Sequence, residues 1–140
     1  LTPLQVMTLA SIVEQETNDN KEKPMVAGMY LNRYKKGMRL QADPTVKYAL
    51  GDFKLQRIRG EHLKVKSPYN TYLYAGLPPS PILLPSIATI DSVLKAEPHG
   101  FLYMCAKEDF SGYHNFATTF SEHVINAKRY QEALNKRGIQ

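Results

Sequence analysis

Two glutamates end an apolar segment near the start of the chain, Leu9-Ala10-Ser11-Ile12-Val13-Glu14-Gln15-Glu16-Thr17. A helix is predicted over residues 3–17, and at 3.6 residues per turn Glu16 continues the apolar stripe through Leu9 and Ile12, whereas Glu14 points to another side. Desolvation at the end of such a stripe raises a carboxyl pKa, which is what a general acid needs near neutral pH. Solvation of both carboxylates at a helix end is the competing interpretation.

The composition is that of an ordinary soluble globular protein of 140 residues, with 43% hydrophobic and 22% charged residues. No apolar run approaches the roughly 20 residues of a membrane span, and no signal-peptide pattern is present. The lone Cys105 excludes an internal disulfide and a cysteine zinc site, and the four histidines lack metal-site spacing, so neither metal nor cofactor is predicted. The net charge of +5 is spread along the chain, which argues against a nucleic-acid partner.

The chain is predicted to form one helix-dominated α+β domain with a small antiparallel β-hairpin. Because the sequence does not begin with Met, we expect residues 1–140 to be a domain excised from a longer protein. Asp43 is expected as the N-cap of a short helix. The predicted elements are helices over residues 3–17, about 24–36, 44–50, 86–97 and 119–137, a helical turn at 59–64, and strands at 101–107 and 113–116.

A proline-rich loop is predicted over residues 67–85, with five prolines and three tyrosines. Proline fixes φ, so the loop should be stiff. Its tyrosines suit either a sugar-binding wall or packing in the core. The two interpretations cannot be separated from the pattern.

The chain resembles the MltG/YceG-like family of endolytic murein transglycosylases in five collinear segments. The first is Ala10-Ser11-Ile12-Val13-Glu14-Gln15-Glu16-Thr17. The others are Tyr30-Leu31-Asn32-Arg33, Gly37-Met38-Arg39-Leu40-Gln41-Ala42-Asp43-Pro44-Thr45-Val46 with Tyr48, Tyr69-Asn70-Thr71-Tyr72 with Gly76-Leu77-Pro78-Pro79-Ser80-Pro81-Ile82, and Leu102-Tyr103 with His114-Asn115-Phe116. Because they span nearly the whole chain in order, the resemblance is specific.

The resemblance implies a lysozyme-like fold and cleavage of the β-1,4 bond between N-acetylmuramic acid and N-acetylglucosamine in peptidoglycan, with a 1,6-anhydro-muramyl end as product. It implies an N-terminal anchor and location at the periplasmic face of the inner membrane. It also points to glycan strands, and cell-wall synthesis proteins, as partners. The family's catalytic acid maps onto Glu16, and Glu16-Thr17 resembles the Glu-Ser pair that ends the catalytic helix of other lytic transglycosylases.

Several polar residues in the matching segments are candidates for substrate binding: Gln41, Asn32, Arg39, Asp43, Thr45, Tyr69, Asn70 and Tyr72. Candidate helpers of the acid are Glu14, Thr17 and His114. Each has a structural alternative, such as a helix cap for Asp43, a helix contact for Asn32 and a hydrogen-bonded turn for residues 69–72.

Helical geometry argues against paired catalysis by the two glutamates. Residues two apart on a helix diverge by roughly 200°, so Glu14 and Glu16 cannot flank one glycosidic bond as the carboxylates of a hydrolase do. A lytic transglycosylase needs one carboxyl group, which acts as acid and then as base. Two alternatives stay open: a hydrolytic muramidase that uses Glu16 with Asp43, and a non-catalytic glycan-binding or scaffold module.

Overall fold

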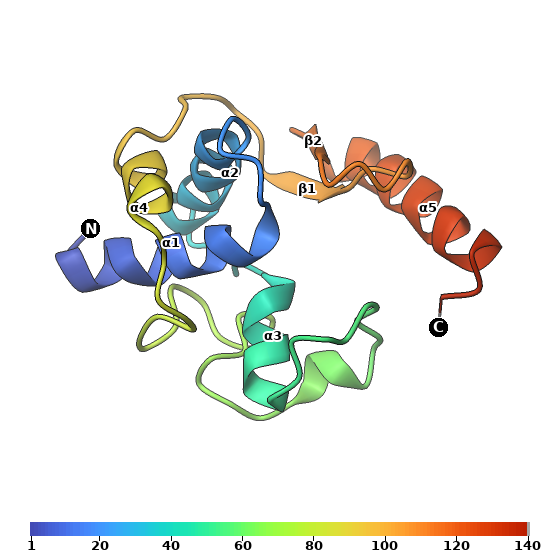
Figure 1. Cartoon of the computed structure of the whole chain (residues 1–140), viewed down its shortest axis with the longest axis horizontal. Helices are drawn as coiled ribbons and strands as arrows, with labels where there is room; N and C mark the ends of the chain where they lie inside the picture. Colours follow the sequence, from blue (N-terminus) through green and yellow to red (C-terminus); the bar gives the residue numbers. More distant parts are fainter. Residues whose placement is uncertain (140) are drawn as a thin grey trace.

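The computed structural model describes residues 1–139 and confirms the α+β class (Figure 1). Every predicted element is present. The α4 helix, β1 and the helical turn predicted at 59–64 are shorter than predicted, whereas β2 has the predicted length and begins one residue later. Helix α4 ends at Leu94, three residues before its predicted end at residue 97. Residue 97 directly precedes Pro98, and proline disfavours helical backbone at the residue before it. The elements are α1 (Pro3–Glu16), α2 (Lys23–Lys35), α3 (Asp43–Leu50), the 3-10 turn η1 (His62–Lys64), α4 (Ile87–Leu94), β1 (Tyr103–Ala106), β2 (His114–Ala117) and α5 (Phe120–Lys136).

Helices α1, α2 and α4 pack on one another and form the hydrophobic core. The apolar stripe of α1 enters this core, where Leu9, Ile12 and Val13 are almost completely buried. Burial of such side chains contributes about 1.5–3 kcal/mol each and fixes the orientation of α1. The orientation of α1 in turn decides where its last residue, Glu16, points.

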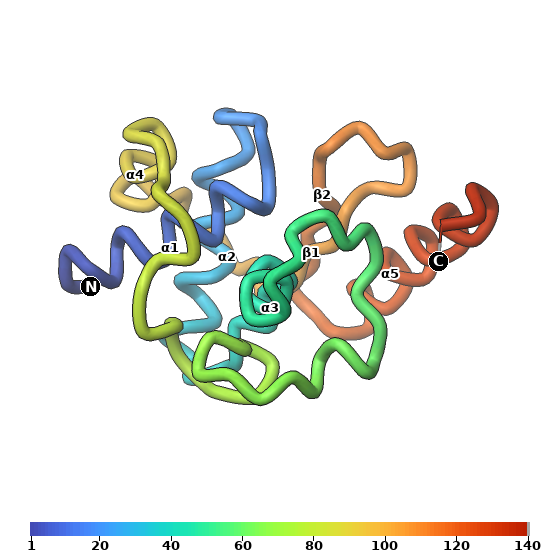
Figure 2. Tube along the Cα trace, turned by 60° about the horizontal axis from the view of Figure 1, so that its bottom comes forward, coloured from blue at the N-terminus to red at the C-terminus, as the bar shows by residue number. Residues whose placement is uncertain are grey.

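The strands β1 and β2 form an antiparallel hairpin in which Tyr103 pairs with Ala117 and Ala106 pairs with His114. Helix α5 packs against this hairpin, at the opposite end of the molecule from α1 and α4 (Figure 1). The segment between α3 and η1 extends toward α5 (Figure 2). There Arg57 donates hydrogen bonds to Asn135 Oδ1 at 2.9 Å and to the Ile139 carbonyl oxygen at 3.0 Å.

Helix starts follow the sequence signals with one exception. Thr2 forms a capping box with Gln5, and the side chains of Ser86 and Thr119 cap α4 and α5. The prediction that Asp43 is the N-cap of α3 is wrong. Ala42 occupies that position, and the Asp43 carboxylate is free to accept a hydrogen bond from Tyr72 instead.

Gly28 lets α2 lie against the segment that leads into β1. A Cβ atom at this position would lie 2.5 Å from the Glu97 carbonyl oxygen and 2.8 Å from Nε2 of His99. We expect Gly28→Ala to lower the free energy of unfolding by about 1–3 kcal/mol, because backbone must move to admit the methyl group. Denaturant unfolding measures this, with Gly60→Ala as control, since a Cβ there meets no atom within 4 Å. Equal losses in the two variants would contradict the close-approach explanation.

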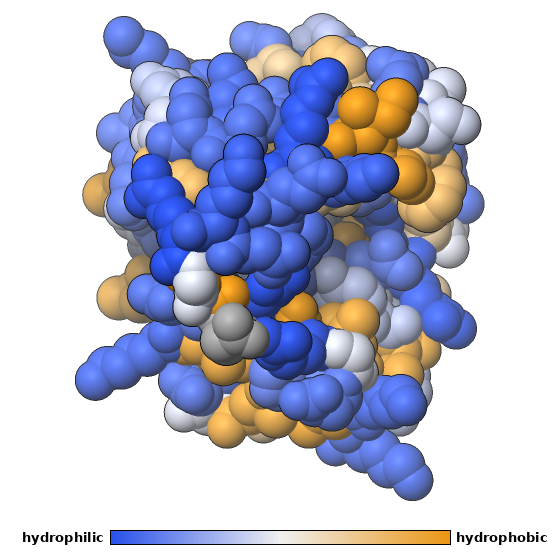
Figure 3. Space-filling model, turned by 90° about the vertical axis from the view of Figure 1, so that its right-hand side faces the viewer, coloured by the Kyte–Doolittle hydropathy of each residue, from blue (hydrophilic) through white to orange (hydrophobic). Residues whose placement is uncertain are grey.

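The face that carries α5 is mostly hydrophilic, with separate hydrophobic patches (Figure 3). None of the helices within residues 1–139 combines the length and the apolar character needed to cross a bilayer.

Candidate active site

Glu16 is the last residue of α1, and its carboxyl group faces the inside of a cleft. Only 14% of its side chain is exposed. The Tyr30 hydroxyl of α2 donates a hydrogen bond to Glu16 Oε1 at 2.8 Å. The prediction that Glu16 continues the buried stripe of α1 is therefore confirmed.

The environment raises the pKa of Glu16 from 4.5 to about 7. Desolvation is the largest cause, and the negative charge of Asp43 acts in the same direction. The charge of His114, the hydrogen bond from Tyr30 and the charge of Lys47 oppose the rise. Near neutral pH a large share of the Glu16 carboxyl groups therefore carries a proton that can be donated.

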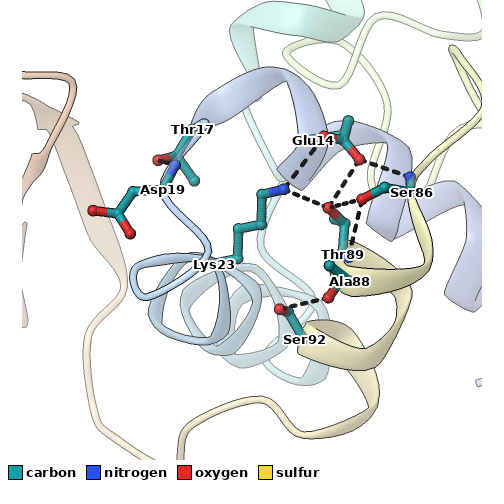
Figure 4. Close-up of polar contacts among 8 residues, drawn as sticks. All are labelled: Glu14, Thr17, Asp19, Lys23, Ser86, Ala88, Thr89 and Ser92. Atoms are coloured by element: carbon teal, nitrogen blue, oxygen red, sulfur yellow. Dashed lines mark hydrogen bonds and ion pairs between the residues drawn. The ribbon is translucent and has the colours of Figure 1, made fainter.

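Glu14 lies in a different environment, on the side of α1 that meets α4 (Figure 4). Its Oε1 accepts hydrogen bonds from the Ser86 amide and from the Thr89 hydroxyl, both at 2.8 Å, and Lys23 Nζ lies 3.3 Å from Oε2. Desolvation raises the pKa of Glu14, but these contacts outweigh it and hold the pKa at about 2. The two glutamates thus diverge as predicted, and Glu14 is an ionised anchor between helices, outside the cleft.

The cleft has a volume of about 400 Å³ and lies between the three-helix core, α3, the hairpin and α5. Five of the residues singled out from the sequence line it: Glu16, Gln41, Asp43, Tyr72 and His114. Long-range folding brings them together from α1, from the segment before α3, from α3 itself, from the proline-rich loop and from β2. Their proposed roles in chemistry stay predictions.

Asp43 and Tyr72 form a hydrogen-bonded pair in the wall of the cleft. The Tyr72 hydroxyl donates to Asp43 Oδ1 at 2.5 Å. Desolvation raises the pKa of Asp43, and the hydrogen bond from Tyr72 opposes that rise. The pKa of Tyr72 is raised by burial and by the neighbouring Asp43 charge, so its hydroxyl remains a donor.

Gln41 adopts a left-handed backbone conformation, with φ of 50°. This conformation costs a residue other than glycine roughly 1–2 kcal/mol. A hydrogen bond from the Gln41 amide to the Thr71 carbonyl oxygen, at 3.2 Å, holds the strained residue in place. Backbone strain of this kind is concentrated at functional sites, which agrees with the exposed Gln41 side chain lining the cleft.

Three predicted substrate-binding residues have backbone partners away from the cleft surface. Asn32 donates to the carbonyl oxygens of His99 and Phe101, each at 2.9 Å. Asn70 is completely buried and donates to two carbonyl oxygens of the segment around η1. The Thr45 hydroxyl is also buried and bonds the Ala42 carbonyl oxygen. None of these three side chains lines the cleft, and their roles in substrate binding stay predictions.

The remaining three predicted residues also lie outside the lining. Arg39 donates to the Tyr72 carbonyl oxygen at 3.3 Å. The Tyr69 hydroxyl lies 2.6 Å from Ser80 Oγ, so this contact joins two parts of the proline-rich loop. Thr17 is buried, and its hydroxyl accepts a hydrogen bond from the Asp19 amide.

Two residues of α2 that were not predicted as site residues also belong to the cleft. Tyr30 and Arg33 both line it, and their spacing of one helical turn on α2 was the available signal. Arg33 is buried and donates to the carbonyl oxygens of Leu102 and Arg39, both at 2.6 Å, so it joins α2 to the hairpin. Within residues 1–139 no group of three or more His, Cys, Asp or Glu side chains is arranged to hold a metal ion.

Comparisons with known proteins agree on one family. The YceG-like family matches residues 1–129. An endolytic murein transglycosylase of Bacillus subtilis is 35% identical over 133 residues, which are 95% of this chain and 36% of that protein. Its counterpart in Streptococcus pneumoniae is 32% identical over 76% of this chain and 20% of its own length. This chain therefore spans about a third or less of these relatives.

A solved structure agrees with the sequence relatives. The crystal structure of a YceG-like protein from Listeria monocytogenes matches with a TM-score of 0.80 and 40% identity. The match covers 86% of this chain and 38% of that chain.

Proposed function

This chain belongs to the YceG-like family, and from that premise we propose that residues 1–140 are the catalytic domain of an endolytic murein transglycosylase. The substrate is peptidoglycan, cleaved at the β-1,4 bond between N-acetylmuramic acid and N-acetylglucosamine. The protein acts in the cell envelope, at the periplasmic face of the inner membrane. The observation that carries the proposal is the buried Glu16 carboxyl, whose pKa of about 7 suits a general acid inside a polar cleft.

In the proposed mechanism Glu16 acts twice. Its proton passes to the departing glycosidic oxygen while the bond from that oxygen to C1 of the muramyl sugar breaks. The carboxylate then takes the proton of the C6 hydroxyl on the same sugar, and the C6 oxygen bonds to C1. One glycosidic bond is broken, one anhydro bond is formed, no water is consumed, and Glu16 regains its proton.

The surrounding residues supply orientation and polarity. The Tyr30 hydroxyl occupies Oε1, which leaves Oε2 as the oxygen that carries the reactive proton. Gln41, with its exposed side chain, is a candidate contact for the N-acetyl groups of the substrate. Asp43 adds negative charge that both raises the pKa of Glu16 and favours the developing oxocarbenium ion.

The position of Asp43 also supports a second candidate, a hydrolytic muramidase. Asp43 lines the same cleft as Glu16, so a second carboxylate is available to the substrate. A muramidase would add water across the bond and leave a reducing end. The transglycosylase would leave an anhydro end, which is lighter by one water.

Mass spectrometry of purified peptidoglycan digested by the protein tests the proposal. We expect anhydro-muramyl products from the interior of the strands. Reducing ends in place of anhydro ends would select the muramidase, and binding of the glycan without any product would leave a non-catalytic module.

Removal of the Tyr30 hydroxyl should change the pH dependence of the reaction. The hydrogen bond from Tyr30 stabilises the ionised form of Glu16 and lowers its pKa. In Tyr30→Phe the pKa of Glu16 therefore rises, and the loss of activity above neutral pH should move to higher pH. The pH profile of kcat measures this shift. Tyr34→Phe is the control, because the Tyr34 hydroxyl accepts a hydrogen bond from Gln5 outside the cleft, and an equal shift there would contradict the assignment.

A further inference from the structure

His114 lies between two glutamates that come from distant parts of the chain. It begins β2, and only 7% of its side chain is exposed. Glu22, which precedes α2, is 8% exposed, and Glu16 is 14% exposed. Three titratable groups are thus enclosed together, and the mechanism above uses one of them.

Glu22 fixes the His114 ring through two contacts. The His114 amide donates to Glu22 Oε2 at 3.0 Å, and Nδ1 of the ring is hydrogen-bonded to Glu22 Oε1. An ionised carboxylate only accepts hydrogen bonds, so the proton of this contact lies on Nδ1. The ring is thereby held in one orientation and one tautomer, as in other carboxylate–histidine pairs.

The opposite side of the ring faces the catalytic carboxyl. Nε2 of His114 lies 4.0 Å from Oε2 of Glu16, the oxygen that Tyr30 leaves free. This distance is too long for a hydrogen bond, so the Glu16 proton remains available to a substrate. It is short enough for a charged ring to act strongly on a poorly hydrated carboxylate.

We propose that Glu22 and His114 are positioning residues for Glu16: Glu22 holds the ring, and the ring stabilises the Glu16 carboxylate that forms when the glycosidic oxygen takes its proton. This inference rests on the proposed function. It gives a reason for a buried histidine beside a buried acid. The carboxylate needs a partner only during the interval between giving and retrieving its proton.

Polar and charged groups on the neighbouring elements decide whether Glu16 is protonated or ionised. Tyr30 of α2, Lys47 of α3 and His114 of β2 favour its ionised form, whereas desolvation and Asp43 of α3 favour the protonated form. Removal of His114 should therefore raise the pKa of Glu16 further. The Glu16 carboxylate intermediate should become less stable.

The kinetics of His114→Gln test this expected rise in the pKa of Glu16. We expect kcat to fall about tenfold, with KM little changed, because one charge–charge interaction in the transition state is lost. The activity that remains should persist to higher pH than in the wild type, a shift that a purely structural defect would not produce. His62→Gln is the control, since His62 lies in η1 outside the cleft. An unchanged pH profile in His114→Gln would overturn the proposal.

A double-mutant cycle tests whether Glu22 acts through His114. Glu22→Ala should lower kcat to a similar extent, and Glu22→Ala/His114→Gln should be no slower than His114→Gln alone. Glu22→Gln should restore part of the activity, because its amide oxygen can still accept from Nδ1. Additive losses would show that the two residues act independently and would overturn the proposal.

NMR of the imidazole nitrogens tests the contact without any activity. The ring nitrogens of His114 should show a proton on Nδ1 in the wild type and should change in Glu22→Ala, while those of His62 and His99 stay fixed as internal controls. Ring nitrogens of His114 that do not respond to Glu22→Ala would overturn the proposal. A wild-type protein with this response but no peptidoglycan products would overturn the proposed function alone.

Discussion

Glu16→Gln should release anhydro-muramyl products from peptidoglycan at least about a hundredfold more slowly than the wild type, the lower end of what general acid–base catalysis contributes. Glutamine has nearly the same shape and can accept the Tyr30 hydrogen bond, but its amide has no acidic proton to transfer and cannot serve as a base. Product masses from digested peptidoglycan, followed over time, measure the difference.

The matched control is Glu14→Gln, the same substitution two residues earlier on the same helix. Glu14 lies outside the cleft, so the folded fraction of this variant should release products at close to the wild-type rate. Product release by Glu16→Gln at near wild-type rate would remove Glu16 from the mechanism. The alternatives would then be Asp43 or a different site.

The second large effect is on stability, where the same two substitutions should act in opposite directions. The pKa of Glu16 is higher in the folded protein than its ordinary value of 4.5, so the folded state binds the proton more tightly. The stabilisation that the Glu16 carboxyl contributes to the folded state is fully present below pH 4.5 and is lost as the pH rises through about 7. At pH 8 the loss amounts to about 3 kcal/mol. Glu16→Gln should therefore unfold at higher temperature than the wild type at pH 8, with a smaller difference at pH 5.

Glu14→Gln should destabilise the protein at neutral pH. The pKa of Glu14 is about 2 when folded, so its contribution is present above pH 4.5 and disappears as the pH falls toward 2. Loss of the carboxylate also leaves Lys23, with 4% of its side chain exposed, without its ionic partner. Because Glu14 is partly exposed, we expect a loss of about 2 kcal/mol rather than the larger cost of a fully buried pair.

Thermal unfolding of both variants between pH 3 and 8 checks these signs. At pH 8, where both carboxyl groups are ionised, the two substitutions remove the same charge from α1, so a general effect of net charge would move both melting temperatures in one direction. Such parallel shifts would contradict the separate environments of the two carboxylates.

The sequence by itself determined the local features. The spacing of Leu9, Ile12 and Val13 identified the buried stripe of α1 and placed Glu16 at its end, because helical periodicity decides which residues share a face. The Thr2 and Ser86 side chains cap α1 and α4 by accepting hydrogen bonds from amides three residues further on, so these helix starts depend on local sequence alone. The collinear family segments indicated the fold class and the cleft residues Gln41, Asp43 and Tyr72.

Only the tertiary structure decided the chemical state of these groups. The helix period separates Glu14 from Glu16. Contacts with Ser86 and Thr89 keep Glu14 ionised, whereas desolvation and the charge of Asp43 raise the pKa of Glu16 against the opposing hydrogen bond from Tyr30. The prediction that Asp43 is an N-cap failed because its carboxylate bonds Tyr72, which lies 29 residues away in the sequence. Glu22 and His114 are 92 residues apart, so no local pattern joins them. A carboxyl pKa depends on hydration and on charges within a few ångströms, and both are set by which distant segments the fold packs together.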